Sequence, residues 1–361
     1  MKKVNVLFLL MLGVFFSACH SDDDTWGDWA KSDAFPGDYR VSAVSFQAED
    51  GVYIGMGFNL ELSDNDKFLR SFYKFDGTTW TSISEPFPVE GRKGSVAFVI
   101  GDTAFVGAGF RDKSSSQDAK DHYFSDFYKF SLKSGKWLKD ANGEYLKTDI
   151  GDFVTGEDSV ACRFWGGIGF ELNGKGYVGT GQLDGRVSKT MFEYNPSTGK
   201  WTSMTMPGDA RVGAVVFKLQ GKAVICLGSD GRSNVVDVYT FDGTTWERKR
   251  PLQNLDGDWN NDYAQIPRSY AMAFTSNRDG EKGYIVGGVG TRTAWEYRLD
   301  EDRWFEVTEF AHAMSTRVAG VGFSIDGYGY VTVGGSSTLT ANDNSTWKFY
   351  PGIDENDNND Y

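Results

Sequence analysis

Hydrophobic and polar residues alternate along this chain in short runs, and the runs recur as one repeated pattern. Its clearest part is an aromatic or aliphatic residue that is followed four positions later by glycine. The copies are Tyr53/Gly57, Phe105/Gly109, Tyr177/Gly181, Val224/Gly228, Tyr284/Gly288 and Tyr330/Gly334. Alternation with a period of two, interrupted by glycine, predicts short β-strands joined by tight turns.

Each repeat has room for four such strands. A phenylalanine lies seven residues before the aromatic or aliphatic residue in five copies: Phe46, Phe98, Phe170, Phe217 and Phe323. In the fifth copy Phe274 lies ten residues before Tyr284, because residues 276–282 lengthen the turn. Further along, a tryptophan follows a second aromatic in the pairs Phe75/Trp80, Phe130/Trp137, Tyr194/Trp201, Phe241/Trp246 and Tyr297/Trp304. Repeats of this kind are typical of β-propellers, in which tryptophan can fill the gap between blades at the rim.

The sixth repeat lacks a fourth strand, because the chain reaches Pro351 soon after its third strand. A matching segment occurs at the other end of the chain. There Trp29 precedes Arg40 much as Trp201 precedes Arg211. We therefore predict that the N-terminal strand completes the last blade and closes the ring, which leaves no open sheet edge. The predicted fold is all-β, with six blades of four antiparallel strands.

Composition supports this fold and excludes some partners. Of 361 residues, 44 are glycine and 15% are aromatic, which fits many short strands and turns. The formal charge is −13, and such an acidic surface disfavours nucleic acid and anionic lipid.

The first residues resemble an export signal. Lys2 and Lys3 precede an apolar run over residues 4–16, which is too short to span a bilayer. Small residues before Cys19 resemble the lipobox of bacterial lipoproteins, and the acids at 22–24 resemble the export tags of surface lipoproteins in Bacteroidetes. The alternative is an ordinary secreted protein.

These segments give a domain plan. It assigns residues 1–18 to a lipoprotein signal peptide, 19–27 to a tether, 28–350 to the propeller and 351–361 to an acidic tail. Cys19 is the expected lipidation site, and the lipid is the only expected membrane attachment. The expected location is the outer membrane, exposed at the cell surface, with the periplasmic face as the alternative.

The aromatic–glycine element, the later aromatic and the spaced tryptophan resemble kelch repeats over residues 29–350. Full diglycines occur only at Gly287-Gly288 and Gly334-Gly335. The resemblance implies a kelch-type propeller. Two enzyme groups share it: galactose oxidases and the six-bladed sialic-acid mutarotases. Galactose oxidases need a copper site with paired histidines, which this chain does not offer, so no cofactor is expected.

Five arginines occupy one equivalent position, six residues before the repeat phenylalanine: Arg40, Arg92, Arg211, Arg268 and Arg317. In the third copy Phe164 stands there. Around a closed ring this position would form a cationic pore mouth suited to an anionic ligand. The alternative is that each arginine binds carbonyls or acids of the neighbouring blade and holds the ring together.

Further candidates lie in long connections on the same face. Arg111 and Arg232 belong to connections between the second and third strands. Trp259, between Asp258 and Asn260, could stack on a sugar ring or fold back under its loop. The acids around Trp259 do not follow the residue pattern of a calcium-binding loop. Cys162 and Cys226 do not have the spacing of metal ligands, so no metal site is expected.

Two functions follow from these features. The first is a surface-anchored, non-catalytic module whose loop face binds a glycan, a peptide or a protein. The alternative is a mutarotase or epimerase of the sialic-acid type, acting at the pore mouth, with Asp184, Asp230 or Glu157 as the acid–base group. Arginines lining an open pocket would favour the enzyme, and arginines bound to the backbone would favour the binding module.

Overall fold

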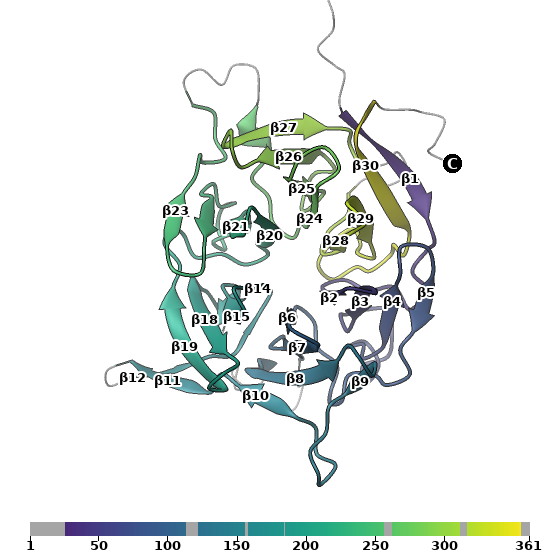
Figure 1. The fold of residues 1–361 in the computed structure, drawn as a ribbon, viewed down its shortest axis with the longest axis vertical. Coiled ribbons are helices and arrows are strands. Elements are labelled where there is room, and N and C mark those ends of the chain that lie inside the picture. The colour runs from purple at the N-terminus through teal and green to yellow at the C-terminus, as the bar shows by residue number, and fades with distance from the viewer. Residues whose placement is uncertain are drawn as a thin grey trace, which may run out of the picture.

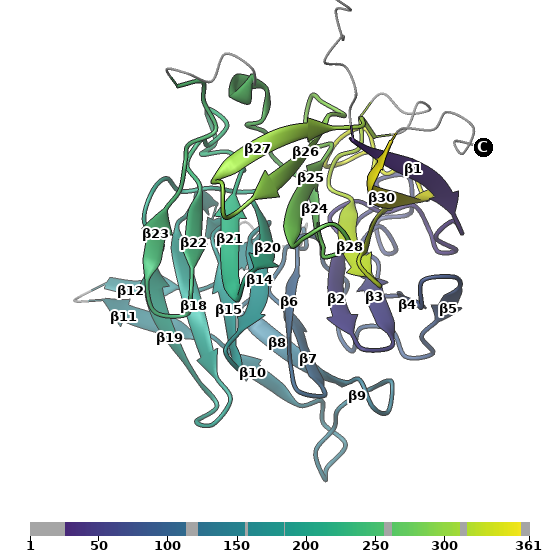
Figure 2. The same cartoon turned by 45° about the horizontal axis from the view of Figure 1, so that its top comes forward.

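Strands arranged in a ring of antiparallel sheets make up this protein, which we describe from a computed structural model (Figure 1). The structure describes residues 26–112, 122–155, 158–183, 185–255, 262–310 and 316–354. Figure 1 looks along the axis of the ring, and Figure 2 tilts the same view.

In each sheet the first strand lies next to the axis and the fourth lies at the rim (Figure 1). The first two sheets are β2 (Val44–Ala48), β3 (Gly51–Gly55), β4 (Phe72–Phe75) and β5 (Trp80–Ser82), then β6 (Val96–Ile100), β7 (Thr103–Gly107), β8 (Asp126–Ser131) and β9 (Lys136–Trp137). A short strand, β10 (Lys147–Asp149), also pairs with β8. The next two sheets are β14 (Ile168–Leu172), β15 (Lys175–Gly179), β18 (Thr190–Asn195) and β19 (Lys200–Thr205), then β20 (Val215–Leu219), β21 (Lys222–Cys226), β22 (Tyr239–Phe241) and β23 (Trp246–Arg248).

The last two sheets carry the chain closure. They are β24 (Met272–Ser276), β25 (Lys282–Val286), β26 (Ala294–Arg298) and β27 (Arg303–Val307), then β28 (Val321–Ile325), β29 (Tyr328–Thr332), β30 (Thr346–Asp354) and β1 (Trp26–Ser32). A single parallel pair, Trp26 with Val307, joins these two sheets along β1 and β27. The strand pairings of the described residues thus form six units of four antiparallel strands.

Three smaller elements lie outside these units. β11 (Asp152–Thr155) and β12 (Asp158–Ala161) form a hairpin. β13 (Phe164–Trp165) pairs with β16 (Gln182–Leu183), which pairs with β17 (Arg186–Val187). A short 3₁₀ turn covers Tyr263–Gln265.

The N-terminal strand completes the last sheet, as the sequence predicts. Trp29 lies opposite Phe349 and Ala30 opposite Lys348 in the antiparallel pair of β1 and β30. The two strands extend further than the predicted boundaries of 28 and 350, since β1 starts at Trp26 and β30 continues to Asp354. The extension arises because Trp26 pairs with Asp354 beyond a bulge.

The repeated aromatics form the core between strands and between blades. Phe46 lies opposite Tyr53 on the neighbouring strand, and their rings stack with centroids 5.0 Å apart. Trp137 of the second sheet packs against Phe72 of the first, at 5.7 Å, so it fills the gap between blades as predicted. Trp29 does the same for the last sheet, where it contacts Phe310 at 5.2 Å and donates a hydrogen bond to the Thr308 carbonyl.

The repeat glycines join each blade to the next. The amide of each one donates to a main-chain carbonyl of the following blade, over 2.7 to 2.9 Å. The pairs are Gly57 to Arg92, Gly109 to Phe164, Gly181 to Arg211, Gly228 to Arg268, Gly288 to Arg317 and Gly334 to Arg40. All six glycines have positive φ, from 76° to 113°, which explains why the repeat requires glycine here.

A second ring of main-chain hydrogen bonds has the opposite direction, because each donor bonds the preceding blade. Its residues lie two positions after the residues whose carbonyls accept in the first ring. It links Ser42, Gly94, Gly166, Gly213, Tyr270 and Ala319, each donating to the one before it, with Ser42 donating to Ala319. These residues also have positive φ, from 52° to 67°. We call the six residues of this second ring the axial annulus. Both rings of hydrogen bonds close on themselves around the axis.

Closure by β1 can be tested with two tryptophans of the same strand. Trp29 is 2% exposed, whereas Trp26 is 56% exposed. Trp29→Ala should lower the free energy of unfolding by about 3–5 kcal/mol, because it leaves a cavity between the last two sheets. Trp26→Ala should change it by less than about 0.5 kcal/mol. Denaturant unfolding of both variants checks this, and an equal effect of the two would contradict the closure.

Candidate functional site

The five repeat arginines are buried, with 0–1% of each residue exposed. Arg40 shows their common arrangement. Its Nη1 donates to the carbonyls of Met56 and Ser71, both at 3.2 Å, and its Nη2 donates to the Ser71 hydroxyl at 3.0 Å. Met56 follows the second strand of the blade and Ser71 precedes the third, so the guanidinium group holds together the two ends of that connection.

Three of the arginines add a carboxylate to this arrangement. Arg92 forms an ion pair with Asp126 at 2.5 Å, Arg211 pairs with Asp237 and Arg317 with Asp343. Arg268 instead donates to the carbonyl and hydroxyl oxygens of Thr293, both at 2.8 Å.

Burial lowers the pKa of Arg40 and of Arg268 to about 10, and that of Arg317 to about 9. These values lie above physiological pH, so the three guanidinium groups remain charged.

These five arginines therefore do not form the predicted cationic pore mouth. Their side chains point into their own blades, where carbonyls and acids use the guanidinium donors, and they are not presented to a ligand at the axis. The architectural alternative fits, with one difference. The side-chain partners belong to the same blade, and it is the arginine's own carbonyl that bonds the neighbouring blade. Sequence spacing placed the residue correctly but could not give the direction of its side chain.

The remaining predicted residues have different positions. Arg111 donates to the Gly91 carbonyl at 3.2 Å and lies over the Phe68 ring, while Arg232 is exposed. The Asp230 carboxylate accepts the amides of Arg232 and Ser233, which lowers its pKa and makes it a turn-forming anion. Trp259, Asp258, Asn260, Asp184, Glu157 and Cys19 lie outside the described residues.

The third repeat differs from the others on the face of the ring where the inner strands begin. Phe164 replaces the arginine, and Phe164–Trp165 forms β13 beside the β16–β17 hairpin. The Trp165 indole donates to the Gln182 side chain at 2.9 Å. In a repeat protein, a unit that breaks the shared pattern is where function is expected to override architecture.

Next to Trp165 lies a lysine that sequence analysis missed. Lys93 follows Arg92 at a position where other repeats have Val41, Val212 and Val318. It is 8% exposed, and its ammonium lies over three rings: Phe58 at 4.7 Å, Trp165 at 5.2 Å and Phe110 at 5.4 Å. We call Lys93, Phe58, Phe110 and Trp165 the Lys93 cage. The sequence does show a lysine where three other repeats have valine. Its meaning depends on which aromatic rings of other blades lie beside it, and the sequence alone does not give this.

Among the residues that the structure describes, the Lys93 charge has aromatic partners but no anionic one at contact distance. Within the described residues, its ammonium makes no hydrogen bond or ion pair. Burial lowers the pKa of Lys93, and the more distant Asp112 carboxylate opposes that shift. Cation–π contact stabilises the ammonium, while its hydrogen-bonding capacity remains available to a ligand.

An acid–base pair adjoins the cage. The His122 imidazole stacks on Phe110, with ring centroids 5.9 Å apart, and its Nδ1 lies 3.4 Å from the Asp112 carboxylate. Within the described residues, no three His, Cys, Asp or Glu side chains gather as ligands for a metal ion.

The axial annulus ends the central channel on this face. Five of its members are serine, glycine or alanine, and the sixth is Tyr270. A side chain at Gly213 would meet the Tyr270 ring at 2.9 Å, so the ring lies across that glycine. Burial raises the pKa of Tyr270 to about 12, so its hydroxyl stays protonated at neutral pH.

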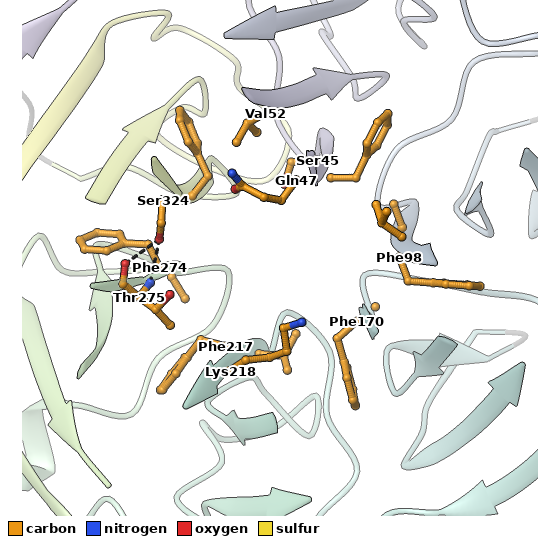
Figure 3. A pocket seen from close by; sticks show the side chains of 18 of the residues that line it. Ser45, Gln47, Val52, Phe98, Phe170, Phe217, Lys218, Phe274, Thr275 and Ser324 are labelled. Carbon is orange, nitrogen blue, oxygen red and sulfur yellow. Dashed lines mark hydrogen bonds between the residues drawn. The ribbon is translucent and has the colours of Figure 1, made fainter. Parts of the chain in front are cut away.

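Three cavities follow one another along the axis. A cavity of about 130 Å³ lies at the annulus, one of about 240 Å³ lies beneath it, and one of about 590 Å³ lies at the opposite end. Figure 3 shows the largest, where side chains of Gln47 and Lys218 extend toward the open space from different strands. The first strand of every sheet contributes to its wall.

An architectural arginine can be distinguished from a ligand-binding one by a pair of variants. Arg211→Met leaves Asp237 buried without its cation and should lower the free energy of unfolding by about 3–5 kcal/mol. The exposed Arg232→Met should change it by less than about 0.5 kcal/mol. Denaturant unfolding followed by tryptophan fluorescence measures both. Unchanged stability of Arg211→Met would contradict the architectural role.

No family model matches this chain. Among curated proteins, a similar sequence is the N-acetylneuraminate epimerase of Pasteurella multocida strain Pm70, which is 25% identical over 224 residues. The match covers 55% of this chain and 57% of the relative, so the chain spans about half the length of that protein. Among solved structures, one titled "Structure of YjhT" matches with a TM-score of 0.61 and 18% identity, covering 87% of this chain and 95% of that one. The strand pairing and this structural match show that the chain has the fold of a kelch-type β-propeller.

Proposed function

We propose that the chain binds an acidic sugar of the N-acetylneuraminate class at the Lys93 cage and interconverts its anomers. The observation that carries the proposal is the Lys93 ammonium, which is enclosed by three rings and makes no ion pair within the described residues. The 25% identity to an N-acetylneuraminate epimerase supports the substrate class.

The cage supplies the two contacts that such a sugar needs. A carboxylate can accept a charge-assisted hydrogen bond from the Lys93 ammonium, which is stronger than a neutral hydrogen bond. The apolar face of a sugar ring can pack on an aromatic ring such as Trp165, which is half-buried.

Anomer exchange requires proton transfers at two oxygens. A base removes the proton from the anomeric hydroxyl while an acid protonates the ring oxygen, so the ring C–O bond breaks and a carbonyl forms. The reverse steps on the other face of the carbonyl give the other anomer, and no co-reactant is consumed. We assign these transfers to His122 and Asp112, whose side chains are 3.4 Å apart beside Phe110.

A second candidate is capture of the sugar without catalysis. It is favoured by the burial of the five repeat arginines, since the enzymatic interpretation of the sequence relied on a cationic ring at the pore mouth. Both candidates use the same face, and they differ only in whether exchange is accelerated.

Both candidates are tested by NMR of N-acetylneuraminate with the purified chain. The wild-type protein should bind the sugar and raise the rate of α/β exchange measured by exchange spectroscopy. Lys93→Met should weaken binding by about tenfold to a hundredfold, the equivalent of one charge-assisted hydrogen bond. Lys189→Met removes an exposed charge on the same face and serves as the control. Affinity should also fall as pH rises through the lowered pKa of Lys93, because the ammonium is lost there.

The outcomes separate the candidates. Binding without faster exchange would replace the enzyme with the capture module. Absence of binding, or equal binding by Lys93→Met and wild type, would overturn both.

We also propose that Cys19 anchors the chain to the outer membrane. The small residues before Cys19, which resemble a lipobox, support this attachment. Within the described residues we find no helical segment with the length and hydropathy needed to span a bilayer. Mass spectrometry of the mature N-terminus should find acylated Cys19, and Cys19→Ala should release the chain from membranes. An unmodified mature terminus in the wild type would contradict the anchor.

A further inference from the structure

A wide cavity lies at the end of the axis opposite the Lys93 cage. It has a volume of about 590 Å³, which falls within the range of small-molecule sites. Its mouth is formed by the final residues of the inner strands, and we call this cavity the axial cup (Figure 3).

Three uncharged polar side chains line the axial cup without internal partners. Ser45 and Gln47 come from β2, and Thr275 comes from β24. Within the described residues, neither the Gln47 amide nor the hydroxyls of Ser45 and Thr275 make a side-chain hydrogen bond. The main chain of Thr275 is occupied instead, since it exchanges hydrogen bonds with the Ser324 hydroxyl at 2.6 and 3.1 Å. An amide and two hydroxyls therefore offer both donors and acceptors to the cup.

The charges of the cup cancel. Lys218 and Glu171 are the only charged residues among its described lining, and they form an ion pair at 3.1 Å across β20 and β14. Their side chains are 51% and 28% exposed, so each keeps hydrogen-bonding capacity toward the opening. Because the two charges are paired, the described lining of the cup carries no net charge and gives no net electrostatic preference for an anion or a cation.

On its inner side the cup meets a second cavity along the axis. Its inner wall consists of small or apolar residues, Ala97, Gly169, Val216, Ala273 and Gly322, which also line the next cavity of about 240 Å³. A third cavity, of about 130 Å³, lies at the annulus beside Tyr270. A molecule in the cup can therefore place its C–H surface against the apolar inner wall.

We propose that the axial cup is a second binding site, for a neutral polyhydroxylated molecule of monosaccharide size. Hydroxyl groups match the unpaired amide and hydroxyls, the apolar wall accommodates ring C–H groups, and the balanced ion pair excludes a strong preference for charge. The site is independent of the Lys93 cage, from which the annulus and Tyr270 separate it.

The test uses neutral probes and the full chain. Glucose, galactose, N-acetylglucosamine and mannitol are screened by saturation-transfer NMR, and any that binds is titrated by calorimetry. At least one should bind with a millimolar Kd. Ser45→Leu places a larger apolar group in the cup and should weaken that binding by at least about tenfold. Gln47→Ala should weaken it by about threefold to tenfold, the equivalent of one neutral hydrogen bond.

Two controls make the outcome decisive. Lys222→Met removes a half-buried charge on the same face outside the cup, and Lys93→Met alters the other site. Neither variant should change the affinity for the neutral probe. Gln47 is exposed, so Gln47→Ala keeps the test valid if Ser45→Leu fails to fold. The proposal is overturned if no probe binds, or if the bound probe keeps wild-type affinity in Gln47→Ala and in folded Ser45→Leu.

Discussion

Two closed rings of main-chain hydrogen bonds around the axis are the constraint on which this structure depends. In one ring each repeat glycine donates to the next blade, and in the other each annulus residue donates to the previous one. Both rings need positive φ, which costs a non-glycine residue of order 1 kcal/mol or more and is sustained only where surrounding contacts fix it. The residue before each ring glycine is also left-handed, whether it is Met56, Ala108 or Gly287. The Gly287-Gly288 diglycine therefore matches this geometry, whereas Gly334-Gly335 is displaced by one residue, with Val333 in the first place.

The buried arginines couple these rings to the blades. The carbonyl of Arg92 accepts from Gly57 of the preceding blade, while its guanidinium bonds Ala108, the neighbour of its own ring glycine. Arg92 therefore links the hydrogen bond between blades to the start of the connection between the second and third strands of its own blade. In the third repeat Phe164 accepts the same main-chain bond from Gly109 but has no guanidinium. There the Phe164 side chain is buried and stacks on Phe192, while the next residue, Trp165, forms one wall of the Lys93 cage.

Much of the fold could be predicted from the sequence, because its determinants are local and periodic. Phe46 and Tyr53 lie seven residues apart and meet across one hairpin, and Trp29 was recognisable as the missing member of its series. The site could not be predicted in the same way. The direction of the Arg40 side chain depends on carbonyls that only the folded connection brings together. Lys93 meets its three rings from three blades, and no spacing along the chain relates Phe58 to Trp165. The axial cup likewise depends on the ends of strands that are far apart in sequence.

The most direct test of the closed rings is amide hydrogen exchange at the six repeat glycines, measured by NMR. Gly334 decides the matter, because its acceptor is the Arg40 carbonyl at the other end of the chain. All six amides should exchange only through global unfolding, with Gly334 protected as strongly as Gly228. Rapid exchange at Gly334, with protection at the other five, would show that the ring is open where the chain ends meet.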